Sequence, residues 1–151
     1  MHRGGRSAAS GFRDFFGGHS VMVAVRRSIG IDTNETVSMT VMWYDNAMDQ
    51  DPNDPEWFDI ERVYTFDWDS FNKPDWKRLT VVMNSLPGFV DTAESFARWY
   101  SPIDDPENGY LWGSVEPPGL QVAGTLKDSV WKEWDLAFRI AISSFPFRDL
   151  E

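Results

Sequence analysis

Carboxylates are concentrated in one short part of this chain. The segment YDNAMDQDPNDPEWFDIE, residues 44–61, contains seven of them, together with two prolines, Trp57 and Phe58. Such a segment could bind a metal ion, attract a basic partner or keep the protein hydrated. Hard cations such as Ca²⁺ take about six to eight oxygen ligands, and closely spaced aspartates can supply them. Metal binding is therefore the first chemistry to consider.

The calcium-loop pattern of EF-hands does not fit this segment. With Asp49 at the first ligand position, Asp54 stands where the turn glycine belongs and Ile60 where the bidentate glutamate belongs. An irregular site would have to borrow carboxylates from a later acidic stretch: Asp104, Asp105 and Glu107. The pattern favours an acidic loop with neither a metal ion nor another cofactor.

A second carboxylate pair, Asp67 and Asp69, follows an apolar stretch in VYTFDWDSF. This stretch resembles the first motif of haloacid-dehalogenase-type phosphatases. The resemblance implies that Asp67 is the nucleophile and Asp69 the general acid, with Mg²⁺ as cofactor. The chain departs from the motif at Phe71. A metal-dependent hydrolase is thus one alternative, and two charged residues that protect an edge strand from aggregation are the other interpretation.

Signatures of other enzymes are missing from the sequence. The two histidines, His2 and His19, lie in or beside the N-terminal stretch, so no Ser-His-Asp arrangement is available to a core site. The chain contains no cysteine, no phosphate-binding glycine loop and no dinucleotide-binding fingerprint. We therefore expect a protein without catalytic activity.

Eight tryptophans suggest a carbohydrate-binding module as a further alternative, because indole rings stack on sugars. Five of them fall on predicted core faces: Trp43, Trp68, Trp76, Trp131 and Trp134. Trp57, Trp99 and Trp112 are less constrained. Trp57, inside the acidic segment, is the best candidate for an exposed anchor, although burial against a sheet is an equal alternative.

Charge divides the chain into two parts. Residues 1–27 carry five Arg against Asp14, a net +4, whereas the remainder carries nine Lys and Arg against 23 Asp and Glu, a net −14. A body of that sign repels nucleic acid and anionic membranes and favours cationic partners. Because the chain has no cysteine and no apolar run of membrane-spanning length, we expect a cytoplasmic protein that binds neither nucleic acid nor membrane.

The N-terminal half is predicted to contain a tail and three strands. Residues 1–18 are expected to form a flexible basic tail, and residues 19–151 a single domain. Alternating β-branched and aromatic residues predict strands in three stretches, residues 20–30, 35–45 and 59–71. The acidic segment would then be a long loop between the second and third strands.

The C-terminal half is predicted to contain three helices and a hairpin. Helices are expected within residues 72–88 and 91–102, where apolar residues recur at helical spacing between prolines. A Pro-Pro-Gly turn predicts a hairpin within 108–126. A last helix should begin with a Thr125–Asp128 capping box and carry an Asp135–Arg139 ion pair on the face opposite its apolar seam. The order βββααββα describes an α+β domain, an antiparallel sheet of about five strands with three helices on one face.

These observations favour a non-enzymatic, acidic protein-binding domain. It would cover a basic surface of its partner, as an immunity protein or inhibitor does. Aromatic anchors supply affinity in interfaces, and surrounding charge speeds encounter. The predicted binding residues are all in the acidic segment: Asp45, Asp49, Asp51, Asp54, Glu56, Trp57 and Phe58.

Overall fold

The computed structural model describes residues 21–30 and 36–149. The predicted tail, residues 1–18, lies outside this part of the chain. Within it the main elements are β1 (Val21–Gly30), β2 (Thr36–Asp51), β3 (Asp54–Tyr64), α1 (Lys73–Ser85), β4 (Phe89–Val90), β5 (Ala97–Trp99), β6 (Tyr110–Glu116), β7 (Gly119–Lys127) and α2 (Asp128–Ala141).

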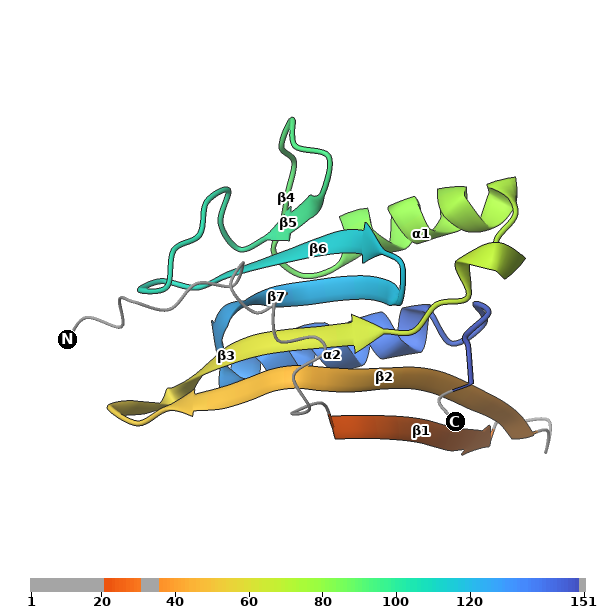
Figure 1. Ribbon diagram of the computed structural model, residues 1–151, viewed down its shortest axis with the longest axis horizontal. Helices are drawn as coiled ribbons and strands as arrows, with labels where there is room; N and C mark the ends of the chain where they lie inside the picture. Colours follow the sequence, from red (N-terminus) through yellow and green to blue (C-terminus); the bar gives the residue numbers. More distant parts are fainter. Residues whose placement is uncertain (1–20, 31–35, 150–151) are drawn as a thin grey trace.

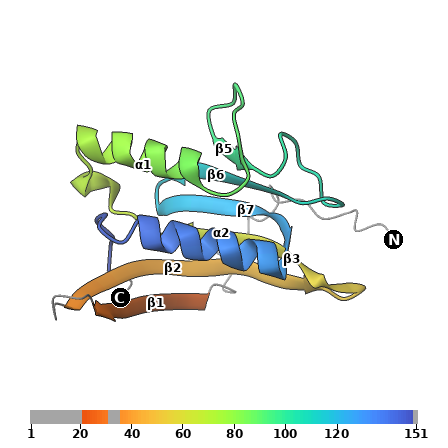
Figure 2. The same cartoon turned by 180° about the vertical axis from the view of Figure 1, so that it is seen from behind.

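The strands form one sheet in the order β1-β2-β3-β7-β6-β5-β4, and every neighbouring pair is antiparallel. Strands β1 to β3 fill one half and β7 to β4 the other, so that β3 and β7 meet in the middle. Both helices lie on the same face of the sheet (Figures 1 and 2). The predicted α+β class is confirmed, but the described residues form seven strands and two α-helices instead of five and three.

The prediction of a helix within residues 91–102 is wrong. Part of this stretch forms β5, which pairs with β4 and β6. Trp99 pairs with Phe89 on one side and Leu111 on the other, and its side chain is fully buried. The burial of this indole and the pairing with two neighbouring strands outweigh a weak local helical pattern, as tertiary context often does.

The other two helices form where they were predicted. Helix α1 begins with a capping box. The Asn72 side chain accepts a hydrogen bond from the Asp75 backbone N–H, and the Asp75 carboxylate accepts one from the Asn72 backbone N–H. Helix α2 begins without the predicted box. Thr125 belongs instead to β7, where its hydroxyl donates to Asp59 at 2.8 Å.

The main core lies between the sheet and the helices. Large aromatic side chains fill it, and those of Tyr64, Phe66, Trp134 and Phe138 are fully buried. The opposite face carries a smaller cluster of three buried residues. At the centre of the sheet β7 approaches β6 so closely at Gly124 that a Cβ there would lie 2.1 Å from a backbone oxygen, which explains the glycine.

Across residues 21–30 and 36–149, neither helix combines the length and apolarity needed to span a membrane.

Candidate functional site

The acidic segment is a hairpin and not the loop expected from its composition. Strands β2 and β3 continue through it as far as Asp51 and Asp54, so only Pro52 and Asn53 remain as the turn. The Asp51 carboxylate is buried and accepts a hydrogen bond of 2.9 Å from the Asn53 backbone N–H. Asp, Pro and Asn are typical of loops, but here these residues form the tight turn of a hairpin.

Hairpin geometry separates the two predicted aromatic anchors. Because successive side chains of a strand point to opposite faces, Trp57 and Phe58 cannot meet one flat partner together. Phe58 packs against the main core on the helix side. Trp57 is only 8% exposed, so it is a buried side chain and not a projecting one.

The predicted acidic residues are also divided. Asp49 and Glu56 are exposed and Asp54 is half-buried near the hairpin tip. Asp51 caps the turn. Asp45 lies further along β2 and pairs with Arg62 at 2.6 Å, which places it in a different, inward-facing site.

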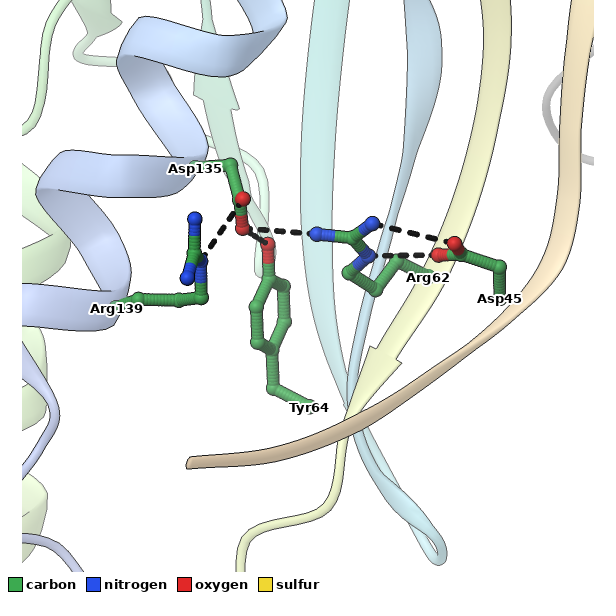
Figure 3. Close-up of polar contacts among 5 residues, drawn as sticks. All are labelled: Asp45, Arg62, Tyr64, Asp135 and Arg139. Atoms are coloured by element: carbon green, nitrogen blue, oxygen red, sulfur yellow. Dashed lines mark hydrogen bonds and ion pairs between the residues drawn. The ribbon is translucent and has the colours of Figure 1, made fainter. Parts of the chain in front are cut away.

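Arg62 is the centre of a charged cluster between the sheet and α2 (Figure 3). Its guanidinium donates to both oxygens of Asp45 at 2.6 and 3.2 Å and to Asp135 of α2 at 2.9 Å. Asp135 also accepts hydrogen bonds from the Tyr64 hydroxyl at 2.7 Å and from Arg139 at 2.9 Å. The predicted Asp135–Arg139 pair therefore exists, but Asp135 faces the sheet instead of the opposite side.

Aromatic rings enclose the Arg62 guanidinium. It lies 3.6 Å from the ring centre of Trp43 and 4.9 Å from that of Trp131. Burial raises the pKa of the Asp45 carboxyl, and the hydrogen bond from Arg62 opposes that shift. A groove of about 510 Å³ runs along this cluster between β2, β3 and α2. With its charges paired and enclosed, the cluster is suited to holding α2 on the sheet.

A second pocket lies at the end of the molecule that carries the hairpin tip. We call it the end pocket; it has a volume of about 370 Å³ and is lined by Trp57, Tyr100, Glu107, Asn108, Leu126, Lys127 and Val130. Its walls come from β3, β7, the start of α2 and the β5–β6 loop, which reach the same end in both views (Figures 1 and 2). The exposed Glu56 lies beside it, 3.8 Å from Lys127.

Carboxylates gather at this end of the molecule, which the hairpin and the β5–β6 loop both reach (Figures 1 and 2). Asp49, Asp54 and Glu56 belong to the hairpin, and Asp105 and Glu107 belong to the loop between β5 and β6. Asp105 organises that loop by accepting from the backbone N–H groups of residues 107 and 108, both at 3.2 Å. We refer to these five residues together as the acidic end.

Tyr100, in the pocket wall, has an unusual backbone. Its φ of 72° makes it the only residue other than glycine with a positive φ in the described part of the chain. Its backbone N–H donates to the Gly88 carbonyl at 2.6 Å, and its ring covers Gly88 so closely that a Cβ there would lie 2.4 Å away. Such conformations cost about 1–3 kcal/mol and persist only where the surrounding structure enforces them.

The Tyr100 hydroxyl is buried and forms no hydrogen bond within the described structure. Burial raises the pKa of this tyrosine to about 12, and the negative charge of Glu133 adds to the shift. The hydroxyl therefore stays protonated at neutral pH. A buried polar group without a partner costs about 1–3 kcal/mol, so it requires an explanation.

A metal site is not formed by the residues that the structure describes. Among them, no three His, Asp or Glu side chains lie close enough to share an ion. Asp67 accepts from the Ser70 hydroxyl at 2.8 Å, and Asp69 is exposed in a short 3₁₀ helix, Trp68–Ser70. The described sheet is antiparallel, whereas the phosphatase family that VYTFDWDSF resembles has a doubly wound sheet, so the resemblance does not extend to the fold.

Tryptophan exposure agrees with the prediction only in part: Trp131 and Trp134 are buried as predicted, whereas other positions differ. Trp57, Trp99 and Trp112, expected to be the least constrained, are 8%, 0% and 7% exposed. Trp76, expected in the core, is 39% exposed. It stacks on Trp68 with ring centres 5.0 Å apart and planes 16° from parallel.

Sequence reasoning missed Arg62 and Tyr100 as site residues. Arg62 is the one cation among nine acids between Asp45 and Asp69, a pattern that could have marked it as their shared partner. Tyr100 carried no such signal, because tyrosine has no preference for a positive φ.

The chain matches no protein-family model, and no curated protein or solved structure was found that matches it.

Proposed function

We propose that this protein binds a basic protein partner without catalysing a reaction, as an inhibitor or immunity protein does. The partner docks on the acidic end. This assignment retains Asp49, Asp54 and Glu56 from the sequence prediction and adds Asp105 and Glu107. Asp45 and Asp51 stabilise the fold instead.

The observation that supports the proposal is the position of these carboxylates at one end of the molecule, where Glu107 lines the end pocket and Glu56 lies beside it. Two segments more than 40 residues apart, the hairpin and the β5–β6 loop, bring exposed acids to one end of the sheet. The net charge of −10 attracts cations over about one Debye length, roughly 10 Å at 0.1 M salt, and the local cluster directs them to this end. The pocket provides the concave surface that affinity requires.

Anchoring differs from the arrangement that the sequence suggested. A projecting Trp57 would insert into the partner. The buried Trp57 instead forms one wall of the end pocket, and the partner inserts a side chain into that pocket. Interfaces concentrate affinity in such well-packed pockets. Phe58 lies on the other face of β3 and has no part in the contact.

Affinity capture at two salt concentrations tests the proposal. Immobilised wild-type protein should retain basic proteins at about 50 mM salt and lose most of them at about 500 mM. The Asp49→Lys/Glu56→Lys variant should capture little at either concentration. A control with the same net charge, Asp69→Lys/Asp149→Lys, changes two exposed acids near the opposite end of β3 and should behave like wild type. Equal capture by all three proteins would refute the proposal.

Carbohydrate binding is a second candidate, favoured by the exposed Trp76. Its indole ends a column of stacked rings that continues through Trp68, Phe66 and Phe147, with successive ring centres 5.0, 5.1 and 4.8 Å apart. Oligosaccharide binding there should quench tryptophan fluorescence in wild type but not in Trp76→Phe. An unchanged wild-type spectrum across a broad oligosaccharide panel would exclude this candidate.

A further inference from the structure

One face of the sheet is buried although no helix or strand among the described residues lies over it. Both helices pack on the other face (Figures 1 and 2). Arg62 reaches α2, so its neighbours Glu61 and Val63 point away from the helices. Residues paired across antiparallel strands share a face, so the partners of these two residues point the same way. We call this surface the helix-free face; at its centre lie Tyr44, Glu61, Val63, Gln121 and Ala123.

The side chains of the helix-free face are closed off from water. Val63 and Ala123 have 0% exposure, and Glu61 has 3%. An antiparallel sheet face that meets solvent usually carries hydrated polar residues. A carboxylate as buried as that of Glu61 is stable where a cation or several hydrogen-bond donors reach it. This face is therefore suited to a covering layer that contains both apolar groups and positive charge.

Residues 1–20 have the composition of such a layer. They carry three arginines and one acid, whereas residues 28–151 have a net charge of −14. The segment also contains three phenylalanines, which can cover the apolar part of the face. These residues are Arg3, Arg6, Phe12, Arg13, Asp14, Phe15 and Phe16. The segment thus complements the helix-free face in charge and in apolar character.

The start of β1 lets this segment reach the face. Val21, the first residue that the structure describes, pairs with Asp45 of β2, so the preceding chain leaves the sheet beside β2. From β1 to β7 is three strand spacings, about 14 Å, whereas twenty residues can extend to about 66 Å. Residues 31–35 connect β1 to β2, and residues 150–151 are too short to cover the face.

We propose that residues 1–20 bind the helix-free face of the sheet in their own chain. Arginines of the segment pair with Glu61 and with Asp59, which lies two residues away on the same face. Its phenylalanines pack on Tyr44 and Val63. The inference goes beyond the proposed function, because it stands or falls independently of what binds the acidic end.

Spin labelling of the full chain tests this contact. The chain contains no cysteine, so Ser10→Cys provides a single attachment site for a nitroxide label. The label should broaden the NMR methyl signals of Val63 and Ala123 severalfold more than those of Leu79, which lies in the core on the helix side. Equal broadening on both sides of the sheet, or broadening on neither side, would overturn the inference.

A variant of the segment alone controls for the fold. Phe12→Ser/Phe15→Ser/Phe16→Ser changes none of the residues that form the described sheet and helices. It should abolish the preferential broadening, because the segment loses its apolar contacts with the face. Unchanged preferential broadening in this variant would overturn the inference.

Trypsin cleavage after Arg13 measures the contribution of charge. Cleavage requires the free segment, so its rate follows the fraction of unbound segment. Glu61→Gln should accelerate it about tenfold, the effect of one hydrogen bond between charged groups. Asp69→Asn removes an exposed acid elsewhere and should leave the rate unchanged. Equal rates in wild type and both variants would contradict the charge pairing. Cleavage after the buried Arg62 reports any general unfolding.

A mixed sample distinguishes the chain's own segment from that of a second copy. Spin-labelled chains without isotopes are combined with unlabelled, isotope-enriched chains, so that only contacts between chains cause broadening. We expect no broadening in this mixture. Broadening of the Val63 and Ala123 signals there would show that a second copy supplies the covering segment, and would overturn the inference.

Discussion

Arg62 of β3 donates a hydrogen bond of 2.9 Å to Asp135 of α2, a residue 73 positions away. The side chains of both residues are at most 10% exposed, so this contact replaces water at two charged groups. Buried charges are tolerated when each is paired and hydrogen-bonded. Asp45 completes the pairing from β2, and the cluster thereby ties three separate elements together.

Removal of the central cation should be costly. Arg62→Met leaves Asp45 buried without its cation and Asp135 with only Arg139 and Tyr64 as partners, and we expect a loss of about 3–5 kcal/mol in the free energy of unfolding. Urea denaturation followed by circular dichroism measures it. Arg139→Gln, which removes a more exposed partner of Asp135, should cost less than about 1 kcal/mol.

A triple variant separates charge from packing in this cluster. Asp45→Asn/Arg62→Met/Asp135→Asn leaves no buried carboxylate without its cation and unpairs only the more exposed Arg139, so it should be more stable than Arg62→Met alone. If the triple variant were the less stable of the two, the cost of Arg62→Met would not come from the stranded carboxylates.

Elements with strong local signals were predictable from the sequence. Pro74 and Asp75 mark the start of α1, and the Pro-Pro-Gly turn marks the hairpin of β6 and β7. The hairpin at 51–54 and strand β5 were not predictable, because each depends on pairing with strands distant in the sequence. Local composition favoured a loop in the first case and a helix in the second.

The candidate site was predictable only in its charge. Composition identified the acidic segment, but alternation along β3 then buries Trp57 and directs Phe58 to the other face. The pocket itself requires the β5–β6 loop to meet the hairpin, a contact that no local pattern encodes. Tyr100 enters the site through a backbone conformation that its residue type does not predict.

Gly88 and Tyr100 should depend on each other. A Cβ at Gly88 would overlap the Tyr100 ring, and the glycine φ of 77° already disfavours other residues. Gly88→Ala should lower the free energy of unfolding by about 1–3 kcal/mol. The same substitution in a Tyr100→Ala background should cost less, because the overlapping ring is gone. Equal costs in both backgrounds would disprove this coupling.

The capping box of α1 should make stability depend on pH. Hydrogen bonds from Arg78 and the Asn72 backbone lower the pKa of Asp75 below its ordinary 3.8. A carboxyl with a depressed folded-state pKa stabilises the fold above about pH 3.8 and loses that contribution as the pH falls through the folded-state value. Below about pH 4, the free energy of unfolding should therefore decline less steeply in Asp75→Asn than in wild type. Identical profiles for the two proteins would contradict this assignment.

The aromatic column should be stabilising at its buried end and nearly neutral at its exposed end. Phe66 is fully buried and contacts five other rings, so Phe66→Ala should cost about 3–5 kcal/mol. Trp76→Ala removes a partly exposed ring and should cost about 1 kcal/mol or less. Thermal and urea unfolding of the two variants would measure both losses in the free energy of unfolding. A larger loss for Trp76→Ala than for Phe66→Ala would contradict this prediction.

The association rate with a basic partner, measured by surface plasmon resonance, tests the central claim most directly. Asp49→Lys/Glu56→Lys and Asp69→Lys/Asp149→Lys have the same net charge and differ in which end of the molecule they change. We predict that the first slows association by about tenfold or more at low salt, and that the second stays within about twofold of wild type. Equal slowing by both variants would mean that net charge alone attracts the partner, and would contradict docking at the acidic end.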